Sequence, residues 1–164
     1  PMTDTTNAAA EAAPTPTFDF AKWEAEQRAR TALLESIRPK NKAAIFAILA
    51  EAGITSVTAE FDGYGDTGGI ESVHAEANGS EIALPEGSTT LLTLGWRETE
   101  PTEKTMPLSE AIEHIVYELL GQTHGGWENN AGAFGNFVFD VASETITLEF
   151  NMRFEDSEFF EHTF

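Results

Sequence analysis

The chain has 164 residues, of which 28 are Asp or Glu and 9 are Lys or Arg, giving a formal net charge of −19. This length favours a single domain with a real core, and 41% hydrophobic residues exclude a wholly disordered chain. The absence of cysteine excludes a disulfide framework, a thiol nucleophile and a cysteine-based zinc site. No apolar run is long enough to span a bilayer, and the first residues do not resemble a secretory signal, so we expect a cytoplasmic protein.

The negative charge is confined to the later part of the chain. Residues 1–42 contain six acidic and six basic residues, so the whole −19 lies in residues 43–164. An acidic surface of this kind repels nucleic-acid phosphates and anionic lipids. We therefore expect no direct binding of nucleic acid or membrane, and the charge favours a basic protein as the partner.

The beginning of the chain is expected to be a tail followed by helices. Residues 1–17 are rich in Ala, Thr and Pro, which predicts a flexible tail. A helical N-terminal section is expected over residues 18–52. Apolar residues at helical spacing predict a first helix that stops at Pro39, and the segment 41–52 predicts a second helix that ends at Gly53.

An acidic α+β domain is expected over residues 53–164. Four segments alternate between apolar and polar residues, which predicts strands with one buried face. A fifth, short strand is expected after the tight turn that Asn78-Gly79 predicts. The apolar stripe of residues 107–120 predicts a helix that ends at Gly121. The four alternating segments are residues 55–62, 70–77, 137–141 and 145–154.

The order of these elements predicts a mostly antiparallel sheet with helices packed on one face and two helices at the N-terminal end. In the last strand, five apolar residues that end with Met152 and Phe154 are expected to face one way. A seven-residue loop is expected at 63–69. Residues 85–106 leave open whether TLLTLGW is a strand or a helix, and TEPTEKTMP after it is expected to be a loop. The terminal EDSEFFEHTF is expected to add an edge strand or to lie along the surface.

Two glycine-rich loops carry a resemblance to a known family. The chain reads FDGYGDTGGIESV at 61–73 and HGGWENNAGAFGNFVFDV at 124–141, followed by ITLEFNMRF and a terminal EHTF. From about residue 50 onward it resembles a family of small acidic bacterial proteins that is known only as a domain of unknown function and often occurs on plasmids and other mobile elements. Typical members read GDSG and NNDGA where this chain has Thr67 and Ala131. The resemblance implies a mobile-element or host-conflict context and no established activity.

A divalent-cation site is one interpretation of these loops. Ca²⁺ and Mg²⁺ prefer several oxygen ligands, which Ca²⁺ accepts on flexible backbone. The alternative is that Asp and Asn in glycine-rich turns bond to their own backbone. The four histidines lack the spacing of metal ligands. A His124–Glu128 pair is an alternative acid–base or metal site, but a loop histidine is more often a capping or solvated residue, so an enzyme is the less favoured interpretation. The candidate metal ligands are Asp62, Asp66, Glu71 and Glu128.

The function that the sequence favours is a non-enzymatic binding or inhibitor protein that engages a basic partner through an acidic face. The most specific version of this interpretation is that the protein is a nucleic-acid mimic that acts against a host defence protein. The alternatives are a metal-binding module or metal-dependent enzyme, and a structural subunit that forms homo-oligomers through its N-terminal helices. No cofactor is expected under the favoured interpretation. The candidate partner-binding residues are Glu60, Asp62, Asp66, Trp127, Glu128, Asn129, Asn130, Glu149, Glu155, Asp156, Glu158, Phe159, Phe160 and Glu161.

Overall fold

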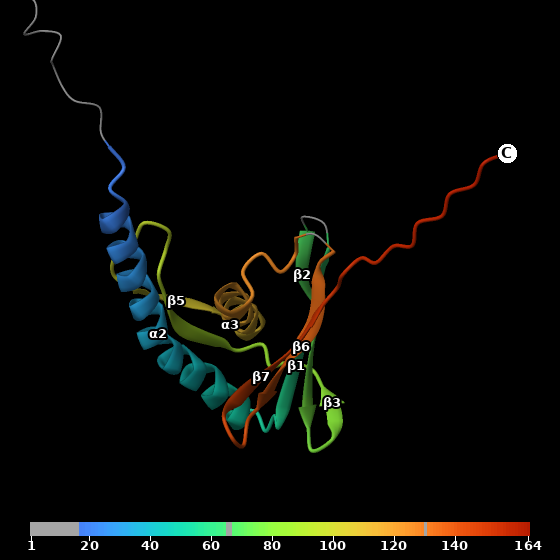
Figure 1. Ribbon diagram of the computed structural model, residues 1–164. Coiled ribbons are helices and arrows are strands. Elements are labelled where there is room, and N and C mark those ends of the chain that lie inside the picture. Colours follow the sequence, from blue (N-terminus) through green and yellow to red (C-terminus); the bar gives the residue numbers. More distant parts are fainter. Residues whose placement is uncertain (1–16, 65–66, 130) are drawn as a thin grey trace, which may run out of the picture.

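A long helix, α2, opens the part of the chain that the computed structural model describes, which comprises residues 17–64, 67–129 and 131–164. All but the last residue of the predicted flexible tail lies outside this part. Figure 1 shows the arrangement of the elements. In chain order they are α2 (Phe20–Glu51), β1 (Ser56–Tyr64), β2 (Thr67–Ala77), β3 (Ser80–Ile82), β4 (Ser88–Thr93), β5 (Thr102–Pro107), α3 (Leu108–Thr123), β6 (Ala133–Asp140) and β7 (Thr145–Met152).

The two N-terminal helices predicted from the sequence are a single helix, with Pro39 inside it. A proline inside a helix removes one backbone donor and crowds the preceding turn, which is why the sequence predicted a break. Packing on both sides of Pro39 holds the helix together, because Ile37 and Asn41 are both buried. The Asn41 side chain accepts a hydrogen bond from the Leu92 N–H (2.7 Å) and donates one to the Leu92 carbonyl (2.8 Å). Tertiary contacts therefore outweigh the local cost of the proline.

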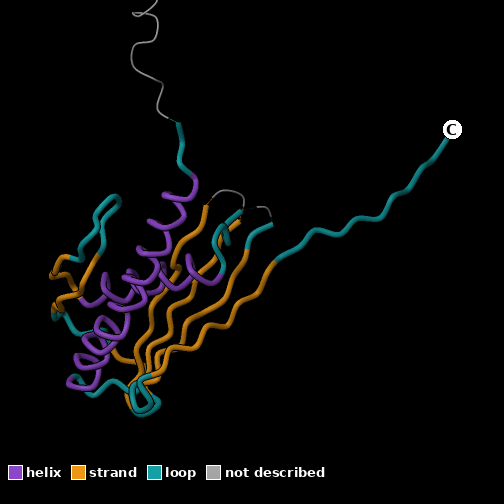
Figure 2. The backbone as a smooth tube through the Cα atoms, turned by 60° about the vertical axis from the view of Figure 1, so that its left-hand side comes forward, coloured by secondary structure: helices purple, strands orange, loops and turns teal. Residues whose placement is uncertain are grey.

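Five antiparallel strands form the main sheet, in the order β3-β2-β1-β6-β7, and β4 and β5 form a separate two-stranded sheet. The predicted α+β class with a mostly antiparallel sheet is therefore confirmed. Figure 2 shows the five strands side by side. The predicted β2–β3 turn is also present, since Asn78 (φ 52°) and Gly79 (φ 85°) both adopt the left-handed conformation of a two-residue hairpin turn.

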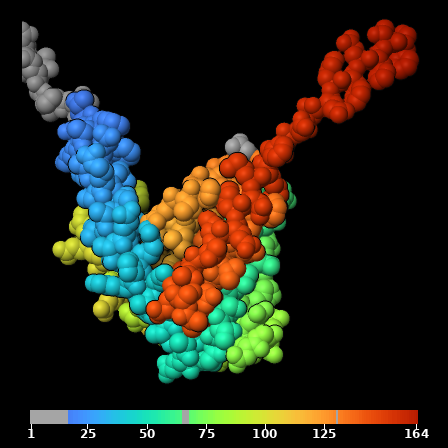
Figure 3. Space-filling view, turned by 60° about the horizontal axis from the view of Figure 1, so that its bottom comes forward, coloured from blue at the N-terminus to red at the C-terminus, as the bar shows by residue number. Residues whose placement is uncertain are grey.

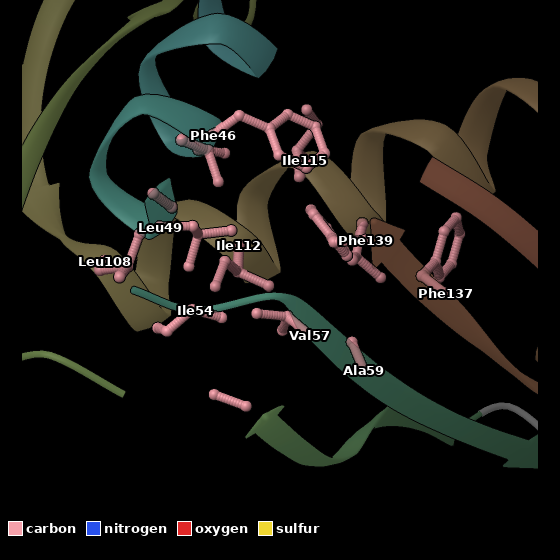
Figure 4. Packing of buried hydrophobic residues seen from close by; sticks show 14 of the residues in the cluster. Phe46, Leu49, Ile54, Val57, Ala59, Leu108, Ile112, Ile115, Phe137 and Phe139 are labelled. Carbon is pink, nitrogen blue, oxygen red and sulfur yellow. The ribbon is translucent and has the colours of Figure 1, made fainter. Parts of the chain in front are cut away.

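The hydrophobic core contains residues from both helices and from one face of the main sheet. The rings of Phe46 in α2 and Phe139 in β6 lie 6.0 Å apart between centroids. The apolar stripe predicted for α3 is buried, although the helix continues past Gly121 to Thr123. Figure 4 shows how the core side chains point toward one another: Phe46, Leu49, Ile54, Val57, Ala59, Leu108, Ile112, Ile115, Phe137 and Phe139.

The connection between β1 and β2 is shorter than predicted. The two strands stay paired up to Tyr64 and Thr67, so that only residues 65–66 lie between them, and the expected seven-residue loop is wrong. Gly63 and Gly68 occupy paired strand positions. Glycine is uncommon in strands, and its presence led the sequence to predict a loop where the chain is in fact extended.

The segment that the sequence left open forms a hairpin. TLLTLGW belongs to strand β4 up to Thr93, and the predicted loop after it contains strand β5. Only Met106 of β5 is buried, so the alternation that marks a half-buried strand is absent there. The Thr90 and Thr105 hydroxyls form a cross-strand hydrogen bond of 2.8 Å.

The end of the chain leaves the body of the protein. Strand β7 ends at Met152, which shares the face of Ile146, Leu148 and Phe150 as predicted, whereas Phe154 lies beyond the strand; both side chains are exposed, at 70% and 83%. After the half-buried Arg153, residues 154–164 run exposed and without strand pairing, and neither the expected edge strand nor a path along the surface is seen. Figure 3 shows this segment projecting beyond the body. In the part of the chain that is described, no helix is long and apolar enough to cross a membrane.

Candidate functional site

The face of the main sheet opposite the core carries a row of carboxylates. Residues directly paired in an antiparallel sheet share a face, so the pairing register places each side chain. Glu60 in β1 lies beside Asn136 in β6, which in turn lies beside Glu149 in β7. Glu76 in β2 shares this face through its pairing with Ser56. We call this the open face; its acidic residues are Glu60, Asp62, Glu76, Glu81, Asp140 and Glu149.

The spacing of these carboxylates follows from strand geometry. Glu60 and Asp62 lie two residues apart on one strand, a rise of about 7 Å, whereas Glu60 and Glu149 lie two strands apart, or about 10 Å. Ser72 donates a hydrogen bond of 2.9 Å to Glu60 and thereby restricts its rotamers. The open face thus holds negative charges in a fixed array on a rigid sheet.

Few positive charges balance this array. None of the five strands, as described, contains lysine or arginine. His74 lies 3.2 Å from Glu81 between Nδ1 and Oε1, and both side chains are well exposed. The second basic side chain at this face is Arg153, which lies just beyond β7 and contacts Asp62. The surrounding field is therefore strongly negative.

Arg153 ties three strands together at one end of the open face. Its Nη1 lies 2.8 Å from Asp62 Oδ1, which is a buried atom, and donates hydrogen bonds to the carbonyl oxygens of Gly63 (3.1 Å) and Ala133 (3.3 Å). The guanidinium also lies over the Phe134 ring, 4.6 Å from its centroid. Sequence reasoning missed this residue, although it is one of only three basic residues after position 42.

The two glycine-rich segments meet at this same end of the sheet. A Cβ added to Gly68 would lie 2.7 Å from the Trp127 ring and 2.9 Å from Glu128 Cβ. A Cβ added to Gly132 would overlap the Gly63 carbonyl oxygen at 1.8 Å. Gly68 is thus required by the side chains that lie against it, and Gly132 by the close approach of another stretch of backbone.

The aromatic residues around the loops pack inward. Trp127 meets Phe61 edge-on with 5.4 Å between ring centroids, so most of this half-buried side chain serves the core. His124 stacks on Phe150 with 3.6 Å between centroids and an interplanar angle of 4°. Phe134, by contrast, is 41% exposed on the open face.

The candidate metal ligands are only partly brought together. Asp62 and Glu71 line the same shallow hollow beside Gly68, and Glu128 lies on the other side of Gly68. Asp66, and Asn130 of the partner-binding set, lie outside the described residues. Over residues 17–64, 67–129 and 131–164 there is no group of three or more His, Asp or Glu side chains placed to hold a metal ion. Asp62 already has a counter-charge in Arg153, and the metal site remains a prediction.

The predicted partner-binding residues of the C-terminal segment lie apart from the sheet. Phe159 and Phe160 are 86% and 71% exposed, and Phe164 is fully exposed. The acidic residues of this segment, Glu155, Asp156, Glu158 and Glu161, are exposed as well. The structure therefore separates the predicted set into the open face, the loop end and this segment.

An acidic residue between the helices has a different environment. Burial raises the pKa of Glu118 above its ordinary value of 4.5, while the nearby His114 and Arg38 oppose this shift. Arg38 Nε and His114 Nε2 each lie 3.7 Å from a Glu118 oxygen. Arg38 also donates a hydrogen bond to Gln122. This cluster joins α2 to α3 and lies apart from the open face.

Comparison with known proteins identifies a family but no activity. A family model described as a family of unknown function, DUF6878, matches residues 37–164, and the chain belongs to this family. The match begins within α2 and includes every strand, α3 and the C-terminal segment. It confirms the resemblance to a family of unknown function. No curated protein and no solved structure matches the chain.

Proposed function

We propose that this member of the family is a non-enzymatic binding protein whose open face engages a basic surface on a protein partner. The observation that carries the proposal is the array of six carboxylates on a sheet face whose own strands have no lysine or arginine. Solubility alone does not explain this arrangement, because acidic residues that are scattered over a surface keep a protein soluble equally well. The protein is proposed to act in the cytoplasm.

Long-range electrostatic attraction would bring a basic partner to such a surface. Carboxylates held on a rigid sheet attract a basic partner over a distance and orient it before contact, which accelerates association at low salt. The same attraction weakens as salt screens the charges. A basic partner also supplies the positive charge that the open face lacks.

The most specific version of the proposal is that the open face mimics a nucleic acid. A protein that binds a phosphate backbone presents a basic groove, and the fixed carboxylates of the open face, spaced about 7 Å along a strand and about 10 Å across strands, offer that groove an alternative ligand. The mobile-element context implied by the sequence resemblance suggests a host defence protein as the target. The partner in this proposal is therefore a nucleic-acid-binding protein.

The test compares two triple variants with equal net charge. One variant, Glu60→Gln/Glu76→Gln/Glu149→Gln, alters the open face; the other, Glu103→Gln/Glu110→Gln/Glu113→Gln, alters exposed residues of β5 and α3. Each is used as bait in a host lysate at low and high salt. We expect basic nucleic-acid-binding proteins with the wild type and the second variant, and their loss with the first. Equal capture by both variants would contradict a role for the open face.

An assembly role is the second candidate, and a different observation favours it. Phe18, Phe20 and Trp23 form an aromatic cluster at the start of α2, with ring centroids 5.7–6.4 Å apart, and all three are exposed. An exposed aromatic cluster of this kind is typical of a contact surface. A Phe20→Ala/Trp23→Ala variant of the full chain would lose self-association in light scattering if this cluster forms homo-oligomers.

A further inference from the structure

The two edges of the main sheet are protected unequally. At one edge, the three-residue β3 pairs only with Ala75–Ala77 of β2, and the rest of β2 is interrupted by a bulge where it pairs with Glu60 and Phe61, so this edge is a poor template for pairing. At the other edge, β7 has eight residues in unbroken register with β6, and its sequence TITLEFNM contains no proline, lysine or arginine. Natural edge strands usually carry such residues or a bulge to prevent association. The β7 edge is therefore open to a further strand.

The C-terminal segment has the pattern of a strand that lacks a partner. Phe160, His162 and Phe164 alternate with the polar residues Glu161 and Thr163. The segment is extended and takes part in no strand pairing in the structure as described. Exposed Phe side chains are costly in water, and an unstructured tail has few aromatic residues. The pattern therefore suits a half-buried strand.

We propose that two copies of this chain exchange these segments, so that residues 158–164 of each copy pair antiparallel with β7 of the other. The register that best matches apolar residues places Phe160 opposite Phe150 and Phe164 opposite Ile146 of the second copy. Phe150 and Ile146 are half-buried on the core side of β7, so the two added rings extend the core of the second copy. This pairing leaves both open faces on the same side of one continuous sheet.

The exit of the segment favours a second copy over the segment's own β7. The Arg153 N–H donates a hydrogen bond of 2.9 Å to the Gly132 carbonyl, and its side chain is held by Asp62, so the chain leaves in line with β7. Figures 1 and 3 show it continuing away from the sheet without turning back. The β7 edge within reach of this segment is therefore that of another copy.

The area available is sufficient for a stable dimer. Phe160 and Phe164 are 71% and 113% exposed, and their burial in both copies removes about 600–1,000 Å² from water. The strand surfaces that they cover bring the total into the range of roughly 1,200–2,000 Å² of standard interfaces. Because both copies carry −19, their repulsion opposes the dimer, and added salt should strengthen it. Binding of a basic partner has the opposite salt dependence, so the two proposals fail independently.

Neighbouring phenylalanines provide a matched test. Phe159→Ala and Phe160→Ala remove the same side chain from adjacent exposed positions, but only Phe160 falls on the face expected to meet Phe150. Light scattering across a concentration series should show a wild-type dimer that salt strengthens. Phe160→Ala should weaken dimerisation about tenfold or more, and Phe159→Ala by less than about twofold. A monomeric wild type, or equal effects of the two variants, would overturn the proposal.

Cross-linking tests the register of the added strand and whether that strand comes from a second copy of the chain. In the proposed register Thr163 lies opposite Thr147 of the second copy, and the chain has no cysteine of its own. Under mild oxidation, Thr147→Cys/Thr163→Cys should yield a disulfide-linked dimer, whereas Thr147→Cys/Ser157→Cys should yield much less. A disulfide within one chain, or equal yields from both double variants, would overturn exchange between copies.

Discussion

Arg153 Nη1 lies 2.8 Å from Asp62 Oδ1, and this pair joins the end of β7 to β1 across the intervening strand. The same nitrogen reaches the carbonyl oxygens of Gly63 and Ala133. A residue that the sequence suggested as a metal ligand is thus held by a cation of the chain itself. Both side chains are partly exposed, so the pair contributes moderately to stability.

Loss of the Arg153 contacts should therefore destabilise the fold. We expect Arg153→Met to lower the free energy of unfolding by about 1–2 kcal/mol, because Asp62 and two carbonyl oxygens lose their partner. Arg97→Met is the control, since Arg97 stacks on the exposed Trp96 with 4.3 Å to the ring centroid. Its effect should stay within about 0.5 kcal/mol in chemical denaturation. Equal losses in the two variants would show that the Arg153 contacts are not stabilising.

Much of the fold follows from the sequence pattern, whereas the contacts that shape the site do not. Alternation predicted β1, β2, β6 and β7, because half-buried strands repeat every two residues. The exposed strand β5 and the helix through Pro39 depend on tertiary pairing, which leaves no local signal. The Arg153–Asp62 pair spans 91 positions in the sequence, and no short-range pattern marks it. The acidic face could be predicted because strand parity alone places Glu60, Asp62 and Glu149 opposite the core.

The close approach of the two glycine-rich segments leads to a second prediction. Gly132 and Gly79 have the same φ of 85°, but a Cβ on Gly132 overlaps the Gly63 carbonyl oxygen, whereas a Cβ on Gly79 meets nothing within 4 Å. Gly79→Ala should cost about 1–2 kcal/mol for its left-handed backbone. Gly132→Ala should cost several kcal/mol more, because the segments must separate. Thermal or urea denaturation that gives similar losses would contradict this packing.

Metal titration separates the favoured function from the metal-binding alternative. With Asp62 paired to Arg153, we expect no saturable heat in calorimetry with Ca²⁺ or Mg²⁺. Any divalent ion screens a chain of charge −19, so melting temperatures must be compared with NaCl at matched ionic strength. Saturable binding that Asp62→Asn abolishes would support the metal-binding alternative.

Burial of Glu118 predicts a defined pH dependence. Its pKa in the folded chain is raised above 4.5, so within the window above pH 4.5 the folded state binds more protons here than the unfolded state. The free energy of unfolding therefore falls as pH rises through this window. Glu118→Gln lacks this loss, so its stability relative to wild type should increase with pH and then level off. Glu113→Gln, exposed on the same helix, controls for net charge, and a relative stability that decreases with pH would contradict the assignment.

The most direct test of the acidic open face is the association rate with a captured basic partner, measured for wild type and for the two triple variants of equal net charge over a salt series. We expect a wild-type association rate that falls steeply with salt. At low salt the Glu60→Gln/Glu76→Gln/Glu149→Gln variant should associate about tenfold more slowly, and the Glu103→Gln/Glu110→Gln/Glu113→Gln variant within about twofold of wild type. Equal slowing of both variants would show that net charge alone matters and would contradict a specific role for the open face.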